Sequence, residues 1–217
     1  MGGVTEEVTF EWDGGSVSGA WHHPPQGRDY VVLAHGAGGN LHTPGLIRYA
    51  EALAGRGVGA VRFNFLYSEA GRKIPDPPAR LEACFRAVAE TVRTRSAALY
   101  LGGRSMGGRI ASHLVAGGFA AKGLIFLSYP LHSPGQPDRL RTSHLTNVGV
   151  PMLFLQGSQD AFARMNLLRS TLKELPTATL HVLDGADHGL RIKGRPEEEV
   201  LAELADVTVA WMQGRRR

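Results

Sequence analysis

The chain has 217 residues, of which 43% are hydrophobic and 20% charged, and its formal net charge is +4. This length fits one domain or at most two small ones, and the composition is ordinary for a soluble globular protein. The sequence contains no uncharged apolar run of about 18 residues and no signal-peptide pattern, so we expect a cytoplasmic protein without a membrane span.

The cysteine count and the charge distribution exclude further classes of protein. Cys84 is the one cysteine, which excludes an internal disulfide and a multi-cysteine metal site. The basic residues are scattered except for Arg215, Arg216 and Arg217, and no nucleic-acid-binding motif accompanies them. We therefore expect no nucleic-acid partner and interpret the three arginines as a solvated tail.

The first 22 residues predict a β-hairpin. Val8, Phe10 and Trp12 alternate with polar neighbours, and the run 13–15 (Asp-Gly-Gly) supplies turn residues. Residues 16–21 would form the returning strand.

After the hairpin, short apolar runs alternate with stretches of helical periodicity. The apolar runs predict strands at residues 30–34, 58–65, 97–101, 124–127, 152–155 and 180–183. The first helix should have Thr43 as its N-cap and Pro44 as its first residue, and should end at Gly55 and Gly57.

Four more helices are expected further along the chain. The next has Asp76 as its cap and buries Leu81, Cys84, Phe85, Val88 and Val92, which makes Cys84 a core residue. The others are a helix at 107–116, one with an apolar face of Met165, Leu168, Leu172 and Leu175, and a last one, opened by Pro196, that buries Val200, Leu204, Val207 and Trp211.

This order of elements predicts an α/β fold in a single domain, residues 1–217. The central sheet would be mostly parallel with an amino-terminal antiparallel hairpin, and helices would cover both faces. In such sheets, functional side chains lie at the carboxyl ends of the strands. The segments that follow the predicted strands are therefore where candidate residues belong.

Ser105 is the candidate nucleophile. It lies in a G-x-S-x-G sequence, residues 103–107, between a predicted strand and a predicted helix. A nucleophile on so sharp a turn has a strained backbone and needs very small neighbours, which the glycines at both ends of the motif provide. The turn also places Ser105 at a helix N-terminus, which favours a developing anion.

The run 35–39 (His-Gly-Ala-Gly-Gly) resembles the motif that supplies an oxyanion donor in serine hydrolases. The backbone N–H groups of Ala37 and Met106 would then stabilise a tetrahedral oxyanion, and His35 would brace the loop. A dinucleotide-binding loop is excluded because Leu41 stands where its motif requires glycine.

Asp160 and His188 follow the last two predicted strands. The chain order Ser105, Asp160, His188, with each residue just past a strand, predicts a triad in which His188 is the base and Asp160 orients it. Asp187 is less suitable than Asp160, because adjacent side chains on a loop usually point apart.

The other histidines and the least regular segment give weaker indications. No H-E-x-x-H motif is present, so we expect no metal and no cofactor. His42 and His132 could lie near the site or be structural, and His132 is also a candidate substrate-binding residue. The segment 130–150 is rich in proline and too short for a large lid, so we expect a shallow pocket that accepts short acyl esters. Arg104 is a candidate substrate-binding residue, or it braces this segment.

Across nearly its whole length the chain resembles the α/β-hydrolase superfamily, near the dienelactone-hydrolase-like proteins and the testis-expressed protein thirty-like branch. The stretches that carry the resemblance are 35–39, 61–65, 102–109, 129–132 and 156–160. The resemblance implies the triad and the oxyanion residues named above. Dienelactone hydrolases proper have a cysteine nucleophile where this chain has Ser105, which argues against dienelactone as substrate.

Two functions remain open from the sequence. The first is a serine hydrolase that acts on small acyl esters or thioesters, with a small ester-like molecule as its partner. The second is a non-catalytic binding or scaffold protein of the same fold. Because every part of the predicted site is retained, the sequence favours the hydrolase.

Overall fold

The computed structural model describes residues 4–214, and the tail formed by Arg215, Arg216 and Arg217 lies outside them. The strands are β1 (Val4–Trp12), β2 (Gly15–His23), β3 (Asp29–Ala34), β4 (Gly59–Phe63), β5 (Ala98–Arg104), β6 (Gly123–Leu127), β7 (Met152–Gly157) and β8 (Ala178–Leu183). The helices are α1 (Pro44–Ala54), α2 (Leu66–Glu69), α3 (Pro78–Arg93), α4 (Met106–Ala116), α5 (Met165–Lys173) and α6 (Glu197–Gln213), with a 3-10 helix η1 (Ser143–Asn147).

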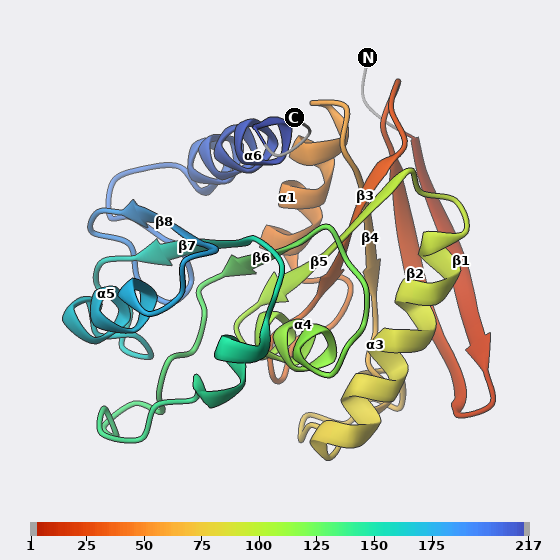
Figure 1. The fold of residues 1–217 in the computed structure, drawn as a ribbon. Helices are drawn as coiled ribbons and strands as arrows, with labels where there is room; N and C mark the ends of the chain where they lie inside the picture. The colour runs from red at the N-terminus through yellow and green to blue at the C-terminus, as the bar shows by residue number, and fades with distance from the viewer. Residues whose placement is uncertain (1–3, 215–217) are drawn as a thin grey trace.

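All eight strands form one sheet in the order β1-β2-β4-β3-β5-β6-β7-β8 (Figure 1). The β1–β2 and β2–β4 pairs are antiparallel, and every later pair is parallel. The predicted amino-terminal hairpin and mostly parallel sheet are therefore confirmed. Strand β3 is buried at all six positions, as a strand covered on both faces must be.

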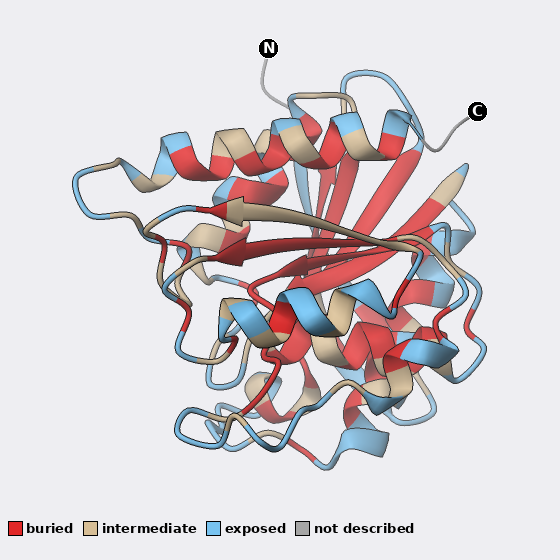
Figure 2. Cartoon of the chain, turned by 60° about the vertical axis from the view of Figure 1, so that its left-hand side comes forward, coloured by how far each residue is buried: buried red, intermediate tan, exposed pale blue. Residues whose placement is uncertain are grey.

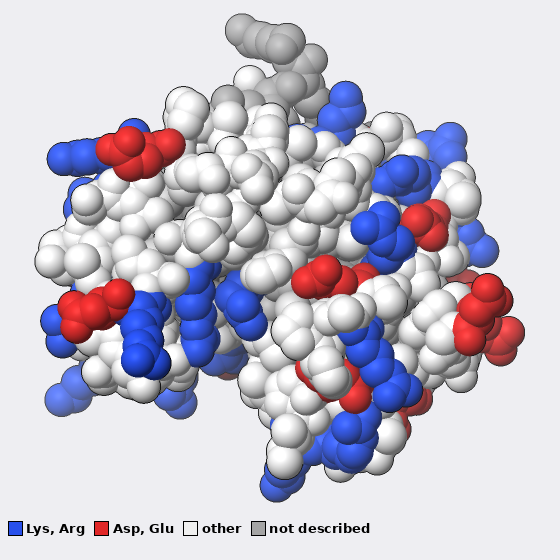
Figure 3. Space-filling model, turned by 60° about the horizontal axis from the view of Figure 1, so that its bottom comes forward, with Lys and Arg blue, Asp and Glu red and all other residues white. Residues whose placement is uncertain are grey.

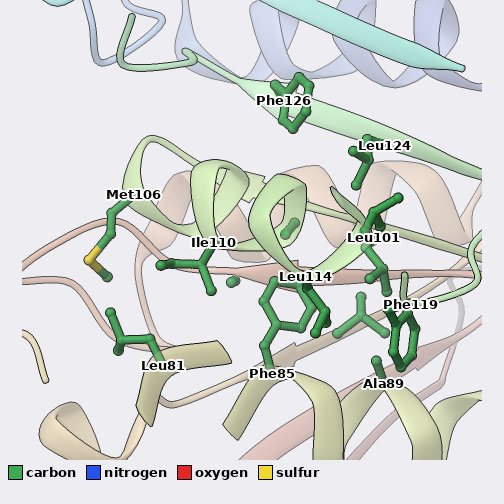
Figure 4. Close-up of a cluster of buried hydrophobic side chains, with 14 of the residues drawn as sticks. Leu81, Phe85, Ala89, Leu101, Met106, Ile110, Leu114, Phe119, Leu124 and Phe126 are labelled. Carbon is green, nitrogen blue, oxygen red and sulfur yellow. The ribbon is translucent and has the colours of Figure 1, made fainter. Parts of the chain in front are cut away.

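Helices cover both faces of the sheet. Figure 2 shows buried strands between helices whose outer sides are exposed. Helices α3 and α4 pack against one face, where Phe85, Ile110 and Phe126 belong to one apolar cluster (Figure 4). Helices α1 and α6 contribute to a second cluster on the other face, which includes Tyr49 and Leu204.

Helix α3 confirms the predicted apolar face but not the predicted cap. Cys84 on that face is 1% exposed, and burial raises the pKa of its thiol to about 12. Pro77 occupies the N-cap position, so Asp76 lies one residue too early to cap the helix. The Asp76 carboxylate instead accepts a hydrogen bond from Arg72 at 2.7 Å.

Helix α1 has Thr43 at its N-cap and Pro44 as its first residue, as predicted, although the Thr43 hydroxyl donates to the Asn40 carbonyl oxygen at 2.8 Å and makes no capping hydrogen bond. Two other details differ from expectation. The predicted strand at 58–65 is shorter, because β4 ends at Phe63 and the chain turns there into the short helix α2, which begins at Leu66. In α6, Val207 and Trp211 are only partly buried at the rim of the second cluster, whereas Val200 and Leu204 are fully buried.

The segment 130–150 forms no long helix, as its prolines predict. It contains only η1 and an isolated bridge between Ser133 and Gln136. His144 of η1 packs on α4, where its ring nitrogen lies 2.8 Å from the hydroxyl of Ser112. The segment thus lies fixed against α4 and forms no large lid.

Candidate active site

Ser105 lies at the junction of β5 and α4 in a conformation that non-glycine residues rarely adopt. Its φ and ψ are 51° and −115°. A Cβ atom on Gly103 or on Gly107 would lie 2.3 Å from the carbonyl oxygen of Ala34 on the neighbouring strand. The glycines therefore allow the turn to fit against β3, which explains the spacing of the motif.

The structure brings the three predicted catalytic side chains together. Ser105 Oγ lies 2.9 Å from His188 Nε2, and His188 Nδ1 lies 2.8 Å and 2.9 Å from the two carboxylate oxygens of Asp160. A carboxylate can only accept, so Nδ1 carries the proton and Nε2 accepts from the serine hydroxyl. The residues come from three segments that follow β5, β7 and β8 at one edge of the sheet.

The Asp160 carboxylate is held by more than His188. Its side chain is fully buried, and it accepts hydrogen bonds from Gln156 Nε2 at 2.5 Å and from the Phe162 N–H at 2.7 Å. These donors stabilise the ionised carboxylate and fix its orientation towards the imidazole. The Gln156 Oε1 atom has no partner among the residues that the structure describes.

Asp187 points away from the imidazole beside it. Its carboxylate accepts hydrogen bonds from the Gly189 N–H at 2.7 Å and from the Arg191 guanidinium at 2.8 Å. Desolvation tends to raise the pKa of Asp187, but the hydrogen bonds and the charge of Arg191 together lower it. The Asp187 carboxylate is thus hydrogen-bonded within its own turn, and Asp160 is the acid that contacts His188.

The loop after β3 borders the same site. His35 is 1% exposed, and its Nδ1 donates to the Gly36 carbonyl oxygen at 2.8 Å while Nε2 accepts from the Phe65 N–H at 3.2 Å. Burial is the main cause that lowers the pKa of His35 to about 4, so the ring is neutral. Its role in bracing the loop is as predicted.

The two predicted oxyanion donors lie on opposite sides of Ser105 in the chain. Ala37 is in the loop that lines a pocket together with Ser105. Met106 is the first residue of α4, so its N–H has no partner within the helix. Both N–H groups are therefore candidates to bind an oxyanion formed on a carbonyl attacked by Ser105.

The pocket at Ser105 measures about 410 Å³. It is lined by Gly36, Ala37, Gly38, Gly39, Thr43, Arg104, Ser105, Phe162 and His188. The Phe162 ring stacks on the His188 imidazole with 4.2 Å between ring centroids. Phe162, Thr43 and Gln156 were missed as site residues, although Gln156 and Phe162 lie close to Asp160 in sequence.

Arg104 and His132, the two weaker candidates, have different positions. Arg104 lines the pocket, but His132 does not. His132 is 1% exposed, its Nδ1 donates to the Ser133 carbonyl oxygen at 2.8 Å, and its Nε2 accepts from the Arg164 N–H at 3.1 Å. The prediction that His132 contacts substrate is therefore wrong, because both of its ring nitrogens are hydrogen-bonded to backbone groups. His42 borders a separate hollow beside β1 and β2.

Within residues 4–214, no group of three or more histidine, cysteine, aspartate or glutamate side chains could hold a metal ion. None of the helices described is long and apolar enough to cross a membrane. Figure 3 shows basic and acidic side chains mixed over the face it presents, without one large basic patch.

Comparison with known proteins identifies the architecture. A family model described as "Alpha/beta hydrolase domain" matches residues 27–213. Among solved structures, an alpha-beta serine hydrolase homologue from Coxiella burnetii aligns with a TM-score of 0.77 at 20% identity, over 94% of this chain and 96% of that one.

Two further structures have the same fold. A Xanthomonas campestris protein, described as an a/b serine hydrolase without lid, aligns with a TM-score of 0.77 at 23% identity and covers 95% of this chain and 94% of its own. A dienelactone hydrolase from Anabaena variabilis aligns with a TM-score of 0.78 at 18% identity over 98% of both chains. At these identities the likeness shows the fold.

Proposed function

Because the chain belongs to the α/β-hydrolase family, we propose that it is a serine hydrolase that cleaves small acyl esters or thioesters through an acyl-enzyme. The observation that carries the proposal is the hydrogen-bonded sequence of Ser105, His188 and Asp160, with contacts of 2.9 Å and 2.8 Å beside a pocket. A serine hydroxyl is a weak nucleophile near neutral pH and needs such an adjacent base.

The first half of the reaction forms the acyl-enzyme. His188 Nε2 takes the hydroxyl proton while Ser105 Oγ attacks the substrate carbonyl carbon. The carbonyl oxygen becomes an oxyanion, which the N–H groups of Ala37 and Met106 would bind. The tetrahedral intermediate then collapses, and His188 returns the proton to the departing alcohol or thiol.

The second half restores the enzyme. Water gives a proton to His188 and attacks the acyl carbon, a second tetrahedral intermediate forms, and Ser105 departs with the proton from His188. The products are a carboxylic acid and free enzyme. Asp160 holds His188 in the required tautomer and stabilises the imidazolium in both halves, which fits its burial and its contact with Nδ1.

The size of the pocket favours short substrates. About 410 Å³ beside Ser105 accommodates a small ester, and the segment 130–150 lies fixed on α4 instead of forming a large apolar lid. We therefore expect no activation by a lipid interface. The lidless description of the Xanthomonas campestris structure is consistent with this expectation.

The test is hydrolysis of p-nitrophenyl acetate, butyrate, octanoate and palmitate, with a short acyl thioester in parallel. We expect kcat/KM to be highest for acetate or butyrate and to show no jump above the micelle threshold. A maximum at palmitate with such a jump would contradict the short-substrate assignment. If no ester or thioester is cleaved and a fluorophosphonate does not label the chain, the non-catalytic scaffold is the better description.

A further inference from the structure

Among the described residues that line the pocket at Ser105, Arg104 is the one formally charged side chain besides the titratable His188. No aspartate or glutamate is among the described residues that line the pocket. Asp160 is fully buried behind the imidazole, and Asp187 is paired with Arg191. A substrate in this pocket therefore meets a guanidinium with no carboxylate beside it in the pocket wall.

The strand register places the Arg104 side chain on the pocket side of the sheet. Arg104 ends β5 opposite Leu127 of β6, and paired residues of parallel strands point to the same face. Leu127 packs in the cluster that α1 and α6 cover. The loop 36–39 and Thr43 precede α1 in the chain and line the pocket on that face.

The Arg104 guanidinium also lacks an internal partner. Within residues 4–214 it makes no hydrogen bond and no ion pair, neither to the segment 130–150 nor elsewhere. Arg56 and Arg195, in contrast, are each paired with a carboxylate: Arg56 with Asp206 at 2.7 Å, and Arg195 with Glu203 at 2.7 Å. Arg104 thus does not brace the segment 130–150, and the five N–H donors of its guanidinium are available to a ligand.

We infer that the substrate is a small ester that carries a carboxylate, and that Arg104 binds this carboxylate while Ser105 attacks the ester carbonyl. The inference rests on the proposed hydrolase function and names its substrate class. A guanidinium binds a carboxylate with two parallel charge-assisted hydrogen bonds, which a neutral group of the same size cannot form. Arg104 would then determine specificity without taking part in proton transfer.

The experiment compares two pairs of esters that differ in charge. In the first pair the carboxylate is on the acyl part: mono-4-nitrophenyl adipate and its methyl ester. In the second it is on the departing alcohol: 3-acetoxybenzoate and its methyl ester. For each pair the readout is the ratio of kcat/KM for the anionic ester to kcat/KM for the neutral one, after subtraction of spontaneous hydrolysis.

We expect Arg104→Gln to lower this ratio about tenfold or more in one of the two pairs. The pair that is affected shows whether the carboxylate lies on the acyl side or on the alcohol side of the scissile bond. Arg104→Lys keeps the charge without the planar fork, so it should restore part of the ratio. Arg169→Gln removes the same charge from an exposed position on α5 outside the pocket, and should leave both ratios unchanged.

Ratios that stay within about threefold of wild type in Arg104→Gln, for both pairs, would overturn the inference. Wild-type turnover of the neutral esters would then leave the serine hydrolase proposal intact. A wild-type chain that cleaves neither these four esters nor the p-nitrophenyl esters and the thioester above, and that a fluorophosphonate does not label, would instead refute the hydrolase proposal and the substrate class with it. Melting temperatures of all variants show whether a lost ratio reflects lost folding.

Discussion

Replacement of Asp160 by asparagine preserves the size of the side chain and removes its charge and one acceptor. The two oxygens of Asp160 accept from the Phe162 N–H and from Gln156 Nε2, and both also face His188 Nδ1. An amide nitrogen in the second position would donate to Nδ1. The imidazole would then carry its proton on Nε2, where it must accept the proton of Ser105.

The expected loss of kcat follows from this change of tautomer. The corresponding change in a well-studied serine protease lowers kcat about 10⁴-fold with the geometry intact, which corresponds to roughly 5 kcal/mol of transition-state stabilisation. We expect a loss of similar size in Asp160→Asn. Gln156 can turn so that its unpaired Oε1 accepts from the new amide, so the fold should survive.

Asp187→Asn is the matched control, since it makes the same chemical change one residue from His188. Asp187 contacts Arg191 in a largely exposed pair, and such pairs add little to stability because water screens the charges. We expect a loss of kcat below about tenfold. The assay is hydrolysis of p-nitrophenyl acetate, with circular dichroism to verify folding. If Asp187→Asn lost more kcat than Asp160→Asn, the assignment of the acid would be refuted.

Two further predictions concern stability. Gly107→Ala places a Cβ 2.3 Å from the Ala34 carbonyl oxygen, so we expect the free energy of unfolding, measured in urea, to fall by about 3 kcal/mol. Gly149→Ala has open space around the new Cβ and should leave the free energy of unfolding nearly unchanged. Equal effects of the two substitutions would contradict the packing argument. Burial is the largest cause that lowers the pKa values of His22, His35 and His144 to about 4. Between about pH 4 and pH 6.5 these side chains are therefore neutral in the folded protein and bind protons only when the chain unfolds. The free energy of unfolding should therefore be fully retained above pH 6.5 and fall between pH 6.5 and about 4, by at most about 1.4 kcal/mol per pH unit for each of His22 and His35. His144 is only half-buried, so solvent screening makes its contribution smaller. Urea midpoints that stay constant or rise on acidification over this range would contradict the burial of neutral histidines.

The parts of the fold that local pattern determines could be predicted from sequence. Alternation in β1 and the apolar run of β3 are fixed by which faces are covered, and the face of α3 follows from helical period. The gathering of Ser105, Asp160 and His188 could be predicted because the carboxyl ends of parallel strands share one edge of the sheet.

Contacts between distant segments could not be predicted in this way. His132 lies in an irregular segment, and only the fold brings the Arg164 N–H to its ring. The same holds for Phe162, whose stacking on His188 depends on how two loops meet. Asp76 failed as a cap for a local reason, since Pro77 takes the cap position and the carboxylate pairs with Arg72.

The central claim is that Ser105 is the nucleophile, and covalent labelling tests it most directly. A fluorophosphonate probe should modify the wild-type chain at one site, which peptide mass spectrometry should map to Ser105. Ser105→Ala should lose labelling and reduce ester hydrolysis by several orders of magnitude, while Ser170→Ala, an exposed serine on α5, should behave as wild type. Labelling at another residue, or a tenth of wild-type activity in Ser105→Ala, would contradict the account.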